Sequence, residues 1–148
     1  MRRALCFCPK GRPEIPYKRK LKIEQIQNEF FYYVECLKIV VGDAVYQRKI
    51  MGDTTPACAW ELKADLMSHT EWLVNNSSLV FSALEINKIK DIQSLVQTID
   101  TDDKLGMESL QWKGLKSPVN TYLEQHKDRI CEIYRKLELD IDWINNFS

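Results

Sequence analysis

The sequence predicts an all-α protein: a helical bundle of five to seven helices preceded by a flexible basic N-terminal arm. Apolar residues recur every three or four positions through most of the chain, which is the period of a helix that buries one face. No segment alternates apolar and polar residues over six or more positions, as a half-buried strand would. Glycine is also scarce, with five in 148 residues. Helices packed on helices are the architecture that fits these observations.

The length and composition predict one globular domain behind the arm. A chain of 148 residues with 45% hydrophobic content is large enough to bury a core. Residues 1–21 contain three of the five prolines and no sustained periodicity, so we expect them to form the arm, with residues 22–148 as a single helical domain. The net charge is zero, yet residues 1–22 carry +7 and the remainder carries −7. The acidic body therefore restricts any contact with nucleic acid to the arm, through Lys18, Arg19, Lys20 and Lys22. The same four residues could instead form an import signal.

The apolar periodicity predicts two helices in the first half of the domain. The first begins near residue 22 and extends for about 27 residues, because its apolar stripe continues as far as Val45. Gly42 lies within that stripe and predicts a kink or a close backbone contact. The second helix is expected from Cys58 to Val74, and Asn75 to Ser78 can end it.

Three further helices are predicted after this break. Two are short, Leu79–Leu84 and Ile89–Ile99, with an interruption at residues 85–88. The third is a long closing helix that starts at Ser117-Pro118, because serine caps helices and proline suits the first helical position. Its stripe continues through Ile141 and Ile144.

The sequence gives no sign of a catalytic site, a metal site or a cofactor. Cys6 and Cys8 are spaced too closely for a usual structural zinc site and lack two further ligands. No phosphate-binding glycine loop or nucleophile elbow occurs. His126 lies on the apolar stripe of the closing helix, where a core histidine bonded to a backbone carbonyl is expected, and His69 is expected near a surface edge.

The C-terminal half resembles a known family of small helical domains. The residues that carry the resemblance are Ser82 to Asn87, Asp91, Ile92, Pro118, Val119, Asn120, His126, Ile130, Leu137 and Trp143. Their order is similar to that in the transcription elongation factor N-terminal helical domain, the family that includes the integrase-binding domain. The resemblance spans residues 79–144. It implies a scaffold in transcription complexes that binds short linear peptide motifs at two interhelical turns.

The predicted partner-binding residues follow from this resemblance and from one aromatic side chain. The two turns correspond to Ile86 with Asn87 and to Leu115 with Lys116. Trp112 lies beside a predicted turn, where a large aromatic side chain can be an exposed anchor for a partner or be partly buried. We therefore predict a non-catalytic protein-interaction module in the nucleus or cytoplasm, with a protein partner and no membrane span.

Three alternatives remain open at this stage. A secreted helical cytokine would need disulfides among Cys36, Cys58 and Cys131. A cysteine-dependent enzyme would need a histidine within reach of a thiol. The aromatic residues 30–33 of the first helix could also face a second copy of the chain, which would make a homodimer.

Overall fold

The computed structural model describes residues 16–42, 59–100, 110–139 and 141–147, and within these ranges the chain forms helices and turns without a strand. The elements, in order, are α1 (Pro16–Val40), α3 (Ala59–Asn76), α4 (Ala83–Gln97), α5 (Leu110–Gln125), α6 (Lys127–Lys136) and the 3-10 helix η3 (Asp142–Phe147). The predicted all-α bundle is confirmed.

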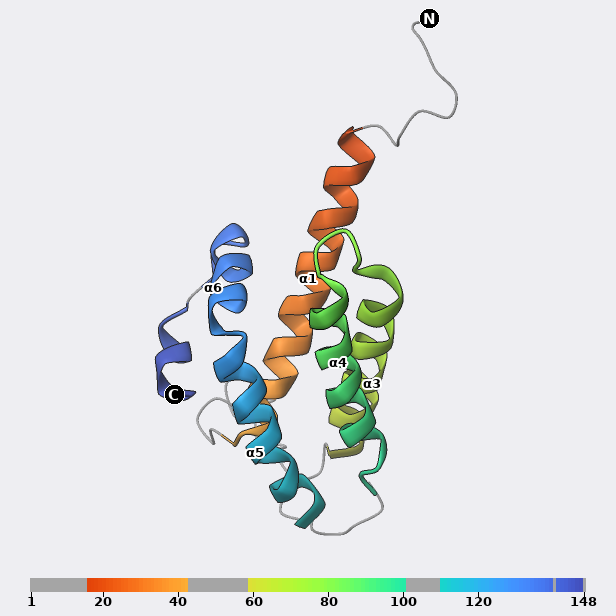
Figure 1. The fold of residues 1–148 in the computed structure, drawn as a ribbon. Helices are drawn as coiled ribbons and strands as arrows, with labels where there is room; N and C mark the ends of the chain where they lie inside the picture. Colours follow the sequence, from red (N-terminus) through yellow and green to blue (C-terminus); the bar gives the residue numbers. More distant parts are fainter. Residues whose placement is uncertain (1–15, 43–58, 101–109, 140, 148) are drawn as a thin grey trace, which may run out of the picture.

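Helix α1 is the central element of the bundle. It lies between the pair α3 and α4 on one side and the nearly continuous pair α5 and α6 on the other (Figure 1). Between Ile26 and Val40 most of its side chains are buried. Its first turns extend beyond the other helices, so the N-terminal end of α1 protrudes from the bundle (Figure 1).

Both ends of α1 differ from the sequence prediction. The helix begins at Pro16, so residues 16–21 belong to a helix and not to the arm. Proline is tolerated in a first turn, and the lysine, arginine and leucine residues that follow are good helix formers. At the other end, the described part of α1 stops at Val40, and Gly42 takes φ +85°. A left-handed glycine is a usual helix terminator, so Gly42 lies just after the helix instead of kinking it. Val45 lies outside the described residues.

The predicted second helix is confirmed by α3, but the two short helices after it are one. Ser77 ends α3, with its hydroxyl donating to the Leu73 carbonyl, and residues 78–81 form a turn. Ser82 then caps α4: its hydroxyl accepts from the Glu85 backbone N–H while the Glu85 carboxylate accepts from the Ser82 N–H. This reciprocal cap starts α4 at Ala83, inside the predicted helix Leu79–Leu84, and α4 continues without a break through the predicted interruption at residues 85–88.

The long closing helix is also corrected. Pro118 lies inside α5, eight residues after the helix begins. Because proline has no backbone N–H, the Gly114 carbonyl receives no helical hydrogen bond from it, and Gly114 is exposed to water. The helical path breaks at His126, separating α5 from α6. Glu138 then takes φ +59°, which ends α6 and turns the chain into η3.

A buried lysine joins three of these elements. Lys38 in α1 is only 4% exposed, and its ammonium lies 2.6 Å from the Glu35 carboxylate. The hydroxyl of Tyr134, from α6, donates to the same carboxylate at 2.9 Å. The ring of Trp143, from η3, lies 3.9 Å from the Lys38 ammonium. A buried ammonium is costly unless it is matched by an opposite charge, so this cluster couples the closing segments to α1.

We expect Glu35→Gln to lower the free energy of unfolding by about 3 kcal/mol, because it removes the negative charge 2.6 Å from a buried ammonium. Glutamine can still accept the Tyr134 hydrogen bond, so the change isolates the charge. The double variant Glu35→Gln, Lys38→Met should be more stable than Glu35→Gln alone. Urea unfolding followed by circular dichroism measures both values, and a double variant less stable than the single would contradict this account.

Candidate functional site

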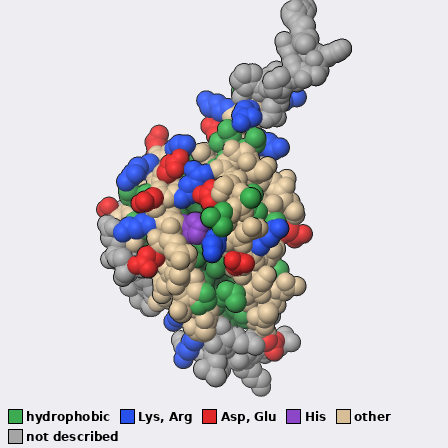
Figure 2. Space-filling view, in the orientation of Figure 1, with side chains coloured by type: hydrophobic (Ala, Val, Ile, Leu, Met, Phe, Trp, Pro, Cys, Tyr) green, Lys and Arg blue, Asp and Glu red, His purple; other side chains and the backbone are tan. Residues whose placement is uncertain are grey.

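The protruding start of α1 is an exposed basic surface. We call the segment Tyr17–Lys22 the basic head. All six of its side chains are exposed, and four of them are the predicted cationic contacts Lys18, Arg19, Lys20 and Lys22. Figure 2 shows Lys and Arg side chains gathered where α1 leaves the bundle. The structure thus presents these four cations on a helix and not on a flexible arm.

The basic head also carries two large apolar side chains. Tyr17 is 67% exposed and Leu21 is 47% exposed. They are four positions apart on a helix, so they lie on the same face, one turn from each other. No other described helix covers this face, because α1 has extended past its neighbours (Figure 1). An apolar pair surrounded by cations is the result.

A groove lies beside the basic head, between α1 and the end of α6. We call it the α1–α6 groove, and its volume is about 410 Å³. It is lined by Arg19, Lys20, Ile23, Glu24, Gln27 and Lys136. Three cations and one carboxylate surround a half-buried isoleucine, so the groove combines a positive rim with an apolar floor.

The predicted peptide-binding turns are not turns in the structure. Ile86 and Asn87 belong to the first turns of α4, where Ile86 is half-buried against the core and Asn87 is exposed. Leu115 and Lys116 lie in the middle of α5. Leu115 is buried, and the Lys116 ammonium lies against the backbone at Gly42, 3.0 Å from where a β-carbon would be.

Trp112 is not an exposed anchor. It is 1% exposed and belongs to the hydrophobic core. The sequence placed it beside a turn because α5 was expected to begin at Ser117, whereas α5 begins at Leu110 and turns this side chain inward. Of the five residues predicted to bind a partner, Trp112 and Leu115 are therefore inaccessible.

The aromatic residues of α1 mostly face the protein's own core. Phe30 and Tyr33 are buried, and Phe31 is half-buried with its ring against Tyr134. Only Tyr32 is exposed, and its ring stacks on His69. The aromatic cluster thus supports the bundle and leaves one ring for contact with a second copy.

Both histidines are held by local partners. The His126 Nδ1 atom lies 3.0 Å from the Tyr122 carbonyl oxygen, and its ring stacks on that of Tyr122 at 4.3 Å. This is the backbone-bonded arrangement expected from the apolar stripe. The His69 Nδ1 atom lies 2.5 Å from a Glu29 carboxylate oxygen, at the surface edge formed by α1 and α3. Within the described ranges, no three His, Cys, Asp or Glu residues are grouped closely enough to hold a metal ion.

The described thiols do not form the bridge that a cytokine would need. Cys36 and Cys131 are both free, and Cys58 lies outside the described residues. Burial raises the pKa of the Cys36 thiol to about 12, and the nearby Asp65, Glu35 and Glu29 carboxylates add to this rise. Cys36 is thus a neutral thiol at physiological pH, which is unfavourable for a nucleophile.

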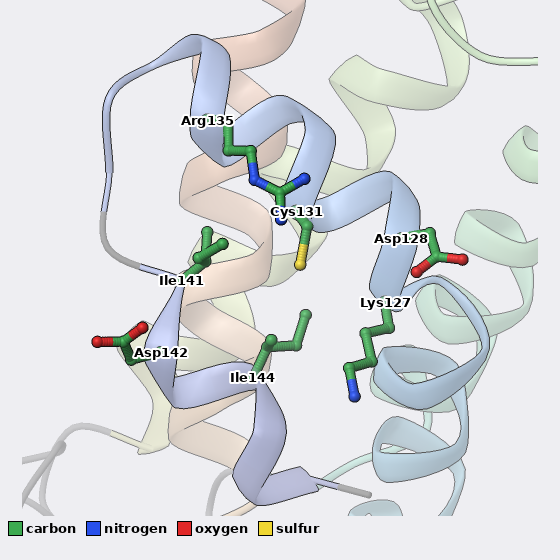
Figure 3. A pocket seen from close by; sticks show the side chains of 7 residues that line it. All are labelled: Lys127, Asp128, Cys131, Arg135, Ile141, Asp142 and Ile144. Carbon is green, nitrogen blue, oxygen red and sulfur yellow. The ribbon is translucent and has the colours of Figure 1, made fainter.

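Cys131 lies in a second groove, between α6 and η3 (Figure 3). Its sulfur points into the space between the two helices, with Arg135 one turn above it and Lys127 one turn below. Ile141 and Ile144 close the opposite side. This arrangement is a partly filled seam between the closing elements of the chain.

No protein family, curated protein or solved structure gives a significant match to this chain. Among the described helices, none has both the length and the hydropathy that crossing a bilayer demands. Sequence reasoning found the four cations of the basic head but missed Tyr17 and Leu21. Their spacing of four residues was a usable signal, obscured by the prolines that made this segment resemble an arm.

The raised pKa of Cys36 predicts a loss of stability at high pH. The unfolded thiol releases its proton near pH 9, whereas the folded thiol keeps it until about pH 12, so raising the pH through this interval favours unfolding. Burial also raises the pKa values of Tyr33 and Tyr122, which add the same effect above about pH 10. Melting temperatures measured against pH should fall from about pH 9 in the wild type.

Cys36→Ala is the matched variant for this experiment. It should have a lower melting temperature at neutral pH, because a buried side chain is lost, but its decline should begin about one pH unit later. Parallel curves for the two proteins would contradict a buried, neutral Cys36 thiol.

Proposed function

We propose that this chain is a non-catalytic protein-interaction module that holds its partner on the basic head of α1. The observation that carries the proposal is the pair Tyr17 and Leu21, exposed one turn apart and flanked by four cations. A few side chains near the centre of a protein interface supply most of its free energy, and tyrosine and arginine are among the commonest of them. The surrounding cations give orientation and faster association with an acidic partner.

The charge distribution of the chain favours a protein partner over nucleic acid. Residues 1–22 carry +7, but the body behind them carries −7. A nucleic acid longer than the head would meet this acidic body, which opposes a phosphate backbone. Contact with nucleic acid is therefore limited to the N-terminal segment, where the cluster Lys18–Lys22 also suits an import signal.

The resemblance of residues 79–144 to the transcription elongation factor family supports a more specific form of the proposal. In that form, the protein is a nuclear scaffold that binds short linear motifs in transcription complexes. The docking surface, however, moves from the two interhelical turns to α1, because Leu115 is buried and Ile86 is packed against the core.

A photocrosslinking experiment tests the proposal. A benzophenone amino acid is introduced at Leu21 in one protein and at Leu84 in another, since Leu84 is also an exposed leucine on a helix, at 68% exposure. We expect Leu21 to give a recurrent protein adduct in nuclear or cytosolic extract, identified by mass spectrometry, that Leu84 does not give. Adding Lys18→Glu and Lys22→Glu should reduce that adduct at least about fivefold, because both cations attract the partner.

Two outcomes would overturn the proposal. One is the same set of adducts at positions 21 and 84, which would indicate nonspecific contact. The other is an adduct at position 21 that ribonuclease or deoxyribonuclease removes. Circular dichroism of each variant checks that the bundle is intact.

A further inference from the structure

We infer that the α1–α6 groove binds an acidic peptide segment. One apolar side chain of the peptide packs on Ile23, and the carboxylates on either side of it pair with the cations of the groove. This inference rests on the proposed function and identifies the chemistry of the partner. The groove is adjacent to Tyr17 and Leu21 but lies on another side of α1, since Lys20, Ile23 and Gln27 follow one another at helical spacing. One partner could therefore occupy both surfaces in a continuous contact.

The positive charge of the groove is available to a ligand. Within the described part of the chain, Arg19 and Lys20 have no carboxylate partner. Lys136 is paired only with Glu132, at 3.6 Å and with both side chains about half exposed, a geometry that contributes little. Against these three cations the groove contains one carboxylate, Glu24. The excess of positive charge complements two or more carboxylates of a partner.

Gln27 supplies a second observation that points to a peptide. It lines the groove and is 7% exposed, and among the described residues its side chain has no hydrogen-bond partner. Its amide atoms still reach solvent, so water bonds them in the free protein and a ligand in the groove can replace that water. A carboxamide both donates and accepts, which matches the N–H and C=O of a peptide backbone.

The apolar floor selects a peptide over a phosphate chain. Ile23 is half-buried and lines the groove, so an aliphatic or aromatic side chain can be removed from water against it. A phosphodiester backbone would contact the cations but would leave Ile23 without an apolar partner. The volume of about 410 Å³ suits a few residues of an extended segment and not a folded surface.

Fluorescence anisotropy with defined peptides tests this inference on the full chain. The probe is a labelled heptapeptide with three aspartates on each side of a leucine. Two matched probes replace the leucine with serine or all six aspartates with asparagine. We expect the first probe to bind and each replacement to weaken binding at least about tenfold, because one removes the apolar contact and the other removes the charge.

Variants of the protein locate the site. Lys136→Glu should weaken binding of the first probe at least about tenfold, and Gln27→Leu should weaken it several-fold without changing the net charge. Lys90→Glu is the control, since it makes the same charge change at an exposed position of α4 away from the groove. Binding that survives Lys136→Glu, or that Lys90→Glu weakens equally, would overturn the inference. The inference would also be overturned if a single-stranded oligonucleotide bound more tightly than the first probe and if Lys136→Glu and Gln27→Leu weakened that binding.

The two proposals fail separately. Combining Lys136→Glu with the photocrosslinker at Leu21 leaves the apolar pair and its neighbouring cations in place. If the adduct persists and binding of the labelled peptide does not depend on Lys136, the partner uses the basic head and the groove inference is wrong. If the peptide binds through Lys136 but no specific adduct forms at Leu21, the groove is a binding site and the basic head is not the docking surface.

Discussion

A lysine buried inside the central helix constrains how the rest of this bundle can close. Lys38 lies on the half of α1 that the other helices cover, where an unmatched ammonium would be strongly unfavourable. Its counter-charge, Glu35, comes from the same helix one turn earlier. The groups that complete the cluster come from elsewhere: the hydroxyl of Tyr134 in α6 and the ring of Trp143 in η3. The end of the chain is therefore held against α1 by a polar requirement as well as by apolar burial.

A second charged cluster ties the other side of the bundle to α6. Arg129 donates to the Glu85 carboxylate at 2.9 Å and to the Val80 carbonyl, and its guanidinium lies 5.1 Å from the Phe81 ring. Glu85 is also the residue that completes the cap of α4. One glutamate thus starts a helix and joins it to another. Arg129 and Glu85 therefore join α4 and α6 through charged groups, as Lys38 and Glu35 join α1 to α6 and η3.

The accessible chemistry is displaced to one end of the molecule. The second half of α1 is covered by other helices, whereas its first turns extend past all of them (Figure 1). Among the described residues, Tyr17 and Leu21 stay exposed and no ion pair joins the cations of the basic head to a carboxylate. Because the buried second half of α1 and its protruding first turns belong to one helix, the basic head is held in a fixed orientation. This lowers the entropy cost of binding relative to a flexible arm.

The sequence determined the class of this protein through its periodicity. Apolar residues that recur every three or four positions indicate helices. This pattern predicted both ends of α3 to within two residues, and it predicted which face of α1 is buried, because both features depend on the local side-chain pattern. It also identified the cations at Lys18–Lys22 and the backbone-bonded His126. Tertiary structure decided the helix boundaries in the second half, since Pro118 and Ser117 carry a start signal that packing overrides, and the Ser82–Glu85 cap outweighs the apolar pattern of residues 79–84. It also decided which residues a partner can reach. Trp112 and Leu115 became core while Tyr17 and Leu21 stayed exposed, because burial depends on which helices lie alongside, and that information is not contained in the spacing of residues along one helix.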